Sequence, residues 1–265
     1  EGQLWMGIST YGFGVEDRRT GKFTHHGQMP DFSSYRGIST VMSIMQSPST
    51  GHIWIGVYNG GAYEIDKSAP VGKRVKAYNS SNAPWMCNSC IYYICEDSKQ
   101  NLWFATKSGV SMRAADGTPV RFDSLKVGDV AVRDMVVMQL VEGHDSEMWL
   151  ASNTHGVIRI QGSGNSLSGY TFSGYSVSNG KLNSDYANCI YKDVEGRIWV
   201  GTGGSGLSLY DAVEDVFLPA HKLWNLPGDA VTNIQSDKKG NLWLGTNAGL
   251  LRLTVPRDLQ NAVSY

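Results

Sequence analysis

Long apolar runs, charge of one sign and catalytic signatures are all scarce in this chain. No stretch of about 18 consecutive apolar residues is present, so no segment is expected to cross a membrane as a helix. The 265 residues carry 23 Lys and Arg against 24 Asp and Glu, a net charge of −1, without a long basic stripe. Nucleic-acid binding through a broad electrostatic patch is therefore not expected. The sequence also has no Gly-x-Ser-x-Gly elbow, His-Glu-x-x-His motif or phosphate loop.

Cysteine is limited to four residues: Cys87, Cys90, Cys95 and Cys189. Cys87 and Cys90 form one Cys-x-x-Cys pair, but no second pair supports a structural zinc site. We expect free, mostly buried thiols, with a Cys87–Cys90 disulfide in an exported protein as the alternative. Proline is sparse at 8 residues, whereas 31 glycines supply the positive φ that tight turns between short strands require.

Six tryptophans recur in one repeated phrase, and they are the most informative feature that the chain does have. Neighbouring members lie 49, 49, 46, 50 and 44 residues apart. A period of about 40–50 residues marked by aromatic residues and glycine is typical of a β-propeller or a similar array. The apolar fraction of 41% is that of a globular chain. The members are Trp5, Trp54, Trp103, Trp149, Trp199 and Trp243.

One repeat, residues 185–217, shows how a blade is expected to form. Alternating residues 185–192 predict a first strand, 197–202 a second and 207–211 a third, and residues 216–218 begin a fourth. The Asp six residues before Trp is expected to accept backbone N–H groups in the turn. The Trp is expected to fill the space between blades, and the Gly two residues after it to allow close backbone approach. An apolar residue expected on the buried face of the first strand recurs nine before Trp, as Met45, Ile94, Leu140, Ile190 and Ile234.

Several repeats depart from this pattern in the turn before Trp. The turn before Trp54 reads Pro48-Ser-Thr-Gly51, and the turn before Trp149 displaces both the usual Asp and the usual Gly. Gln100 stands where better-matched repeats have glycine. Because such changes are tolerable in a turn, the recurring Asp residues are expected to be structural and not a shared metal or catalytic set.

The ends of the chain bear on its domain organisation. Glu1 lies inside a repeat whose leading strand is missing, so we expect residues upstream to have been removed. The last repeat is expected to end in Val263–Tyr265. The predicted fold class is all-β: a β-propeller of four-stranded antiparallel blades with about six Trp-anchored repeats, the first incomplete. Residues 1–265 form either a single β-propeller domain or a fragment of a larger propeller.

The phrase Asp-x-x-Gly-Asn-Leu-Trp-x-Gly-Thr-x-x-Gly-Leu at Asp237–Leu250 resembles the two-component regulator propeller repeat, and Asp193–Leu207 matches with one extra residue in its glycine turn. Such repeats build the periplasmic sensor regions of hybrid two-component histidine kinases of Bacteroidetes. The resemblance implies a non-catalytic periplasmic sensor that is part of an inner-membrane protein. Such a sensor recognises an oligosaccharide or other small ligand and relays the signal to a membrane-linked kinase. The resemblance further implies adjacent sensor domains and a homodimer of the full-length protein as partners, with no cofactor and no nucleic acid.

A ligand is expected at the loops that enter the first strand of each blade, because these loops converge on one face of a propeller. They offer aromatic rings for sugar C–H patches and planar polar groups for hydroxyls. The alternative is that they are ordinary turn residues. Trp85 and Arg133 are the strongest candidates, and Trp85 shares with Trp224 a place outside the repeat phrase. The candidate ligand-binding residues are Tyr35, Arg36, Trp85, Asn88, Arg133, Asp134, Asp185, Tyr186 and Asp229.

Two other functions stay open. A propeller can be a scaffold for protein–protein interaction, and streptogramin lyases are propellers that use a histidine with a metal on the axial face. None of the six histidines falls in the loops that enter the first strands, which argues against lyase-like chemistry. They are His25, His26, His52, His144, His155 and His221.

Overall fold

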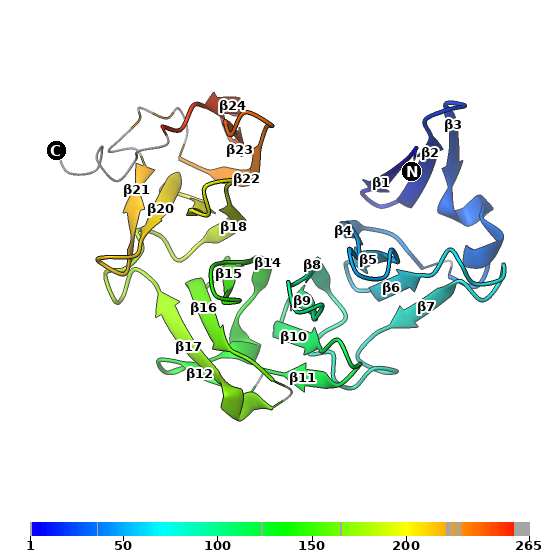
Figure 1. Ribbon diagram of the computed structural model, residues 1–265, viewed down its shortest axis with the longest axis horizontal. Coiled ribbons are helices and arrows are strands. Elements are labelled where there is room, and N and C mark those ends of the chain that lie inside the picture. Colours follow the sequence, from blue (N-terminus) through cyan, green and yellow to red (C-terminus); the bar gives the residue numbers. More distant parts are fainter. Residues whose placement is uncertain are drawn as a thin grey trace. The chain divides into compact units, whose positions relative to one another are not determined.

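The computed structural model describes residues 2–35, 37–122, 124–164, 166–220, 224, 226 and 229–256. The chain divides into two compact units, Glu1–Ser124 and Leu125–Tyr265, and each is described by itself. In both units short antiparallel sheets follow one another along the chain, and each sheet is a meander of sequential strands. Figure 1 labels most of these strands. Within the described residues no helix is long and apolar enough to span a membrane.

Unit 1 contains three of these sheets. The first is three-stranded: β1 (Gln3–Ile8), β2 (Gly12–Asp17) and β3 (Lys22–His25), followed by the short 3-10 helices η1 (His26–Gln28) and η2 (Pro30–Phe32). The second contains β4 (Val41–Gln46), β5 (Ile53–Val57), β6 (Gly61–Ile65) and β7 (Val75–Tyr78). The third contains β8 (Ile91–Glu96), β9 (Leu102–Thr106), β10 (Gly109–Arg113) and β11 (Pro119–Arg121).

Unit 2 begins with the short pair β12 (Lys126–Val127) and β13 (Val130–Ala131) and the 3-10 helix η3 (Val132–Asp134). A four-stranded sheet follows, with β14 (Val137–Glu142), β15 (Met148–Ser152), β16 (Gly156–Gly162) and β17 (Tyr170–Tyr175); η4 (Leu167–Gly169) precedes β17. The next contains β18 (Ala187–Lys192), β19 (Ile198–Thr202), β20 (Leu207–Asp211) and β21 (Val216–Pro219). The last contains β22 (Val231–Ser236), β23 (Leu242–Thr246) and β24 (Gly249–Leu253).

These sheets confirm the predicted fold class: an all-β chain in which the six sheets of three or four strands are the blades of a β-propeller, each carrying one repeat tryptophan. The first sheet has three strands, as expected from a repeat without its leading strand. The predicted final strand at Val263–Tyr265 lies outside the described residues. That residues 1–265 form one domain or part of a larger propeller stays a prediction.

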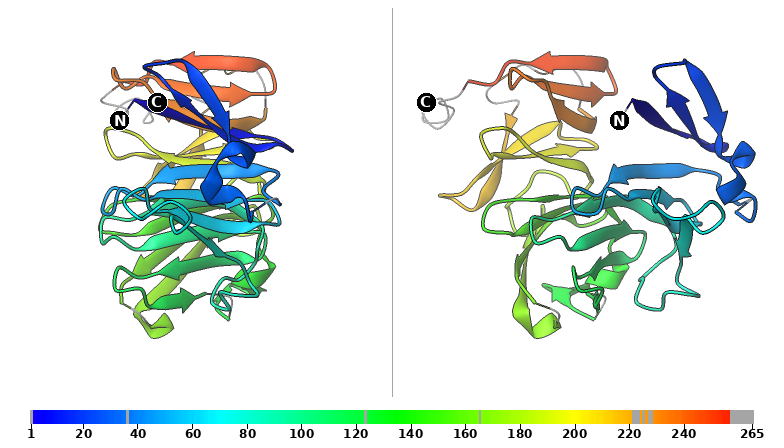
Figure 2. Two further views of the ribbon diagram at one scale, coloured as in Figure 1. Left: turned by 90° about the vertical axis from the view of Figure 1, so that its right-hand side faces the viewer. Right: turned by 45° about the vertical axis from the view of Figure 1, so that its right-hand side comes forward.

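The core of each unit lies between successive sheets, which form layers in Figure 2. Trp54 packs with Phe104 of the following sheet, and Trp149 packs with Ile190 in the same way. The glycine two residues after Trp keeps this gap narrow. A Cβ on Gly56 would lie 2.8 Å from Ile91, and one on Gly201 would lie 2.7 Å from Val231. The predicted roles of the tryptophan and of this glycine are confirmed at these junctions, whereas Trp243 of the last sheet is 37% exposed.

The turn aspartate has the predicted role and one that the sequence did not reveal. Asp193 Oδ1 accepts the backbone N–H groups of Glu195 and Arg197, both at 3.0 Å. Its Oδ2 accepts the Trp199 indole N–H at 2.8 Å. Asp97 and Asp237 bind Trp103 and Trp243 in the same manner, at 2.7 and 3.3 Å. In these three repeats one carboxylate thus joins the turn to its own tryptophan.

The register of the second sheet corrects one prediction. Met45 pairs with Trp54, whereas Ile44 pairs with Ile55 and so holds the position that Ile94 holds opposite Phe104. The reason is the length of the turn. Seven positions separate Gln46 from its partner Ile53, and six separate Glu96 from Leu102. Counting back nine residues from Trp54 therefore reaches the wrong face of β4.

All four cysteines are free thiols. Cys87 and Cys90 do not bond to each other; Cys87 Sγ donates to the Val110 carbonyl at 3.3 Å and Cys90 Sγ donates to Asn59 Oδ1. Burial raises the pKa of the Cys189 thiol to about 12. The sequence-based expectation of free thiols is therefore confirmed, and the disulfide alternative is wrong for this structure.

Candidate functional site

The predicted loop residues of unit 1 are largely engaged inside the unit. The Tyr35 hydroxyl donates to the Val75 carbonyl at 3.2 Å, and its ring packs edge-on against Tyr63 at 5.5 Å. Trp85 packs edge-on against Phe104 at 5.5 Å. Asn88 donates to Ser108 Oγ and accepts the Cys90 N–H, which makes it a turn residue. Arg36 lies outside the described residues.

In unit 2 the predicted residues fall into two groups. Asp185 Oδ1 accepts the Val177 N–H at 2.8 Å, and Asp229 Oδ1 accepts from Asn247 Nδ2 at 2.8 Å, so both carboxylates serve the loops themselves. Tyr186 is 64% exposed. Arg133 and Asp134 are exposed on η3. Together with Asp229, these three side chains are the exposed members of the predicted set among the described residues.

Backbone hydrogen bonds connect the loops that precede the first strands to the preceding sheets. The Gly156 N–H donates to the Asp185 carbonyl at 2.8 Å, and the Gly206 N–H donates to the Asp229 carbonyl at 2.7 Å. Each bond joins the loop before a first strand to the glycine hairpin of the preceding sheet. The Gly61 N–H makes the same bond to Ser89 in unit 1, at 2.8 Å. The backbone carbonyls of Asp185 and Asp229 therefore hold neighbouring sheets together, a role that the identity of their side chains does not predict.

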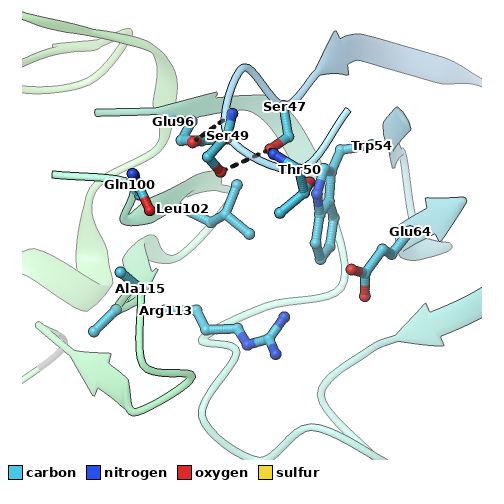
Figure 3. A pocket seen from close by; sticks show the side chains of 11 residues that line it. Ser47, Ser49, Thr50, Trp54, Glu64, Glu96, Gln100, Leu102, Arg113 and Ala115 are labelled. Atoms are coloured by element: carbon cyan, nitrogen blue, oxygen red, sulfur yellow. Dashed lines mark hydrogen bonds between the residues drawn. The ribbon is translucent and has the colours of Figure 1, made fainter. Parts of the chain in front are cut away.

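A cavity of about 160 Å³ lies in unit 1, between the β4–β7 sheet and the β8–β11 sheet (Figure 3). Trp54 and Leu102 supply apolar walls, and Glu64, Glu96 and Arg113 supply charge. The remaining lining residues are Ser47, Ser49, Thr50, Gln100, Ala114 and Ala115. In Figure 3 the Glu96 and Arg113 side chains approach from different sides of this space.

The cavity lies where one repeat departs from the phrase. Ser47 occupies the position of the turn aspartate: its N–H bonds to the His52 carbonyl as the Asp97 N–H bonds to the Asn101 carbonyl. The Ser47 hydroxyl is taken up by the turn, since it accepts from the Thr50 hydroxyl at 2.8 Å. The Trp54 repeat thus lacks the carboxylate that the other turns place beside the indole N–H.

The charged groups of the cavity are held in different ways. Glu64 is buried and satisfied, because Oε1 lies 2.8 Å from His52 Nδ1 and Oε2 accepts the Tyr78 hydroxyl at 2.7 Å. Burial and this bond to Glu64 raise the pKa of Tyr78 to about 12. Arg113 lies over the Tyr78 ring, 6.0 Å from its centroid. Glu96 Oε1 accepts the Ser49 N–H at 3.3 Å, whereas Glu96 Oε2 is buried without a hydrogen-bond partner.

A second cavity, about 470 Å³, lies beside the first sheet of unit 1 and includes the predicted Tyr35. His25 and His26 line it, with ring centroids 4.3 Å apart. Both rings are bound to backbone: His25 Nε2 lies 2.5 Å from the Tyr11 carbonyl and His26 Nδ1 lies 3.2 Å from the Phe13 carbonyl. Burial lowers the pKa of His26. No three potential metal ligands cluster in the described part of the chain.

The sequence did not point to Glu64, Glu96 or Arg113. Each comes from a different strand, and none belongs to the repeated phrase. The available signal was the turn at residues 47–52, where a serine replaces the aspartate and the turn is longer. That signal marked a departure from the pattern without showing that a cavity results.

Comparison with known proteins agrees with the repeat pattern. The model of the two component regulator propeller family matches residues 86–108, 181–204 and 225–248. The chain therefore carries repeats of this family. No curated protein sequence matches.

Several solved structures share the fold. The extracellular domain of the putative hybrid two component system BT3049 from B. thetaiotaomicron aligns with a TM-score of 0.71 and 18% identity over 94% of this chain and 31% of its own. PorZ of Porphyromonas gingivalis, an essential surface component of the type-IX secretion system, aligns at 0.69 and 16% over 96% of this chain and 39% of its own. A putative gluconolactonase aligns at 0.51 and 13%, over 94% and 89%. This chain thus spans less than half the length of the first two.

Proposed function

We propose that this chain, which carries two component regulator propeller repeats, is a non-catalytic sensor module of a two-component signalling protein. The observation that carries the proposal is the match of three separate repeats to that family. The fold likeness to the extracellular domain of a putative hybrid two component system, over 94% of this chain, supports it. Identity of 18% to that domain is evidence of fold, so the function rests on the repeats.

The module recognises a glycan-derived ligand and relays its presence to a membrane-linked kinase. Exposed loop residues of unit 2 support this part of the proposal, because Tyr186 offers an aromatic face and Arg133 and Asp134 offer planar charged groups for hydroxyls. The module lies outside the cell or in the periplasm, as part of an inner-membrane protein. Its partners are adjacent sensor domains and a second copy of the full-length protein. It needs no cofactor and binds no nucleic acid.

A thermal-shift screen of this chain against oligosaccharides of different classes tests the proposal. One class is expected to raise the melting temperature, because a ligand that binds only the folded state stabilises it. Tyr186→Ala and Arg133→Ala should each lower the affinity for that ligand about 10-fold. Lys238→Ala removes an exposed cation from the Asp237 turn and should change nothing. A screen without any shift would favour a scaffold for protein–protein interaction, and turnover of a substrate would show an enzyme.

A further inference from the structure

The cavity between the β4–β7 and β8–β11 sheets holds a carboxylate oxygen that the protein leaves unmatched. Glu96 Oε2 is buried and accepts no hydrogen bond among the described residues, although Oε1 accepts the Ser49 N–H. A buried acceptor without a donor costs free energy, and the cost is larger for a charged group. A molecule in the cavity that donates to Glu96 would remove this cost.

A cation lines the same cavity. Arg113 contacts the Tyr78 ring and forms no ion pair with a carboxylate in the part of the chain that the structure describes. Glu64 does not neutralise it directly, because its two oxygens are engaged by His52 and Tyr78. Arg113 and Glu96 approach the cavity from separate sides and do not meet. The cavity therefore presents one unpaired positive group and one unsatisfied carboxylate oxygen.

Backbone strain is retained at the same place. Gln100 has φ of 66°, a left-handed conformation that Gly196 and Gly240 adopt in the equivalent turns, with φ of 84° and 82°. A non-glycine residue is disfavoured there. Its side chain lines the cavity. Trp54 and Leu102 complete the cavity with apolar surface.

We propose that this cavity binds a small zwitterion, a molecule with one ammonium and one carboxylate group. The ammonium donates to Glu96 Oε2, and the carboxylate accepts from Arg113, whose guanidinium can bind it through two N–H groups. The carbon chain between them lies against Trp54 and Leu102. A cavity of about 150 Å³ holds one benzene molecule, so a volume of about 160 Å³ suits a ligand of similar size. This site is separate from the loop residues of the proposed sensor site and does not depend on that proposal.

Isothermal titration calorimetry on the whole chain with a length series tests the site. The probes are glycine, β-alanine, γ-aminobutyrate and 5-aminovalerate, with n-butylamine, butyrate and glucose as single-function or neutral controls. One spacing should bind at least about 10-fold more tightly than its neighbours. The controls should bind weakly or not at all, because butylamine and butyrate each pair with only one of the two charged groups and glucose pairs with neither. Absence of binding by every zwitterion would overturn the proposal, as would equal binding of butylamine or glucose.

Variants then assign the binding to this cavity. Glu96→Gln and Arg113→Gln should each lower the affinity for the tightest-binding zwitterion about 10- to 100-fold, since each removes a charge-assisted hydrogen bond. Glu142→Gln is the matched control: Glu142 ends β14 and pairs with Met148, as Glu96 ends β8 and pairs with Leu102. Circular dichroism and the melting temperature show that each variant is folded. Unchanged affinity in folded Glu96→Gln and Arg113→Gln proteins would place the ligand elsewhere and reject the site.

Discussion

In unit 1 the junction between the β4–β7 and β8–β11 sheets is open, because it contains the cavity. In unit 2 the junction between the β14–β17 and β18–β21 sheets is filled by side chains, although both junctions are built on the same register. In unit 1 Glu64 pairs with Trp54 across β5 and β6, and in unit 2 Arg159 pairs with Trp149 across β15 and β16. Tyr78 and Tyr175 also hold equivalent places on the fourth strands, opposite Ala62 and Val157. The two junctions therefore differ in side chains while they share a backbone plan.

In unit 2 another carboxylate replaces the turn aspartate that the Trp149 repeat lacks. The Trp149 indole N–H donates to Glu147 Oε1 at 2.7 Å, so a glutamate two residues before the tryptophan takes over from the missing turn aspartate. The Arg159 guanidinium lies 5.3 Å from the Trp149 centroid and donates to the Tyr210 hydroxyl at 2.9 Å. Asp215 then accepts hydrogen bonds from Tyr175, Tyr210 and Lys181.

Unit 1 has no such replacement. Arg113 holds the register position of Tyr210, since each follows the residue that pairs with the repeat tryptophan of its sheet. Within the described residues no acid near Arg113 plays the part of Asp215. The repeat therefore sets the distance between sheets, while a few side chains outside the phrase decide whether the space is filled by the protein or left for a ligand.

The greatest loss of stability is expected when the filled junction of unit 2 is disrupted. Arg159→Ala should lower the free energy of unfolding by about 3 kcal/mol, because it removes a mostly buried cation from three aromatic rings and from Asp215. Arg113→Ala should lower it by less than about 1 kcal/mol, because Arg113 lines an open cavity. Urea unfolding of both variants checks this. Equal losses would mean that the junctions are not energetically different.

An intermediate effect depends on pH. Partial burial opposes ionisation of Asp215, but hydrogen bonds from Lys181, Tyr175 and Tyr210 hold its pKa at about 2, below the unfolded value of about 3.9. Because the folded pKa is the lower one, the stabilisation is present above about pH 4 and is lost as pH falls towards 2. The difference corresponds to roughly 2.6 kcal/mol, and screening of a side chain that is 37% exposed reduces it to about 1 kcal/mol.

Asp215→Asn should therefore lower the unfolding free energy at pH 7 by about 1 kcal/mol, with the gap to wild type closing between pH 4 and about 2. Denaturant unfolding across that pH range measures the gap. A gap of the same size at pH 2.5 and pH 7 would show that Asp215 acts through shape and not through its charge.

The repeated phrase predicts the six sheets, the turn aspartates and the glycine contacts because each of these is local and periodic. The site could not be predicted in the same way. Trp85 has no place in the phrase and was a strong candidate for ligand binding, but its ring packs on Phe104. Glu64, Glu96 and Arg113 become neighbours only when two sheets pack together, and no spacing within one repeat encodes that meeting.

The smallest expected effect concerns the strained turn beside the open junction. Gln100→Gly should raise the free energy of unfolding by about 0.5–1 kcal/mol, because glycine adopts φ of 66° without steric cost. Gly240→Gln makes the reverse change in the equivalent turn of unit 2, where φ is 82°, and should lower the stability by about 1 kcal/mol. Urea unfolding measures both. A loss of stability in Gln100→Gly would show that the glutamine side chain supports the fold, whereas a gain accompanied by weaker zwitterion binding would show that the strain is tolerated for the sake of the cavity.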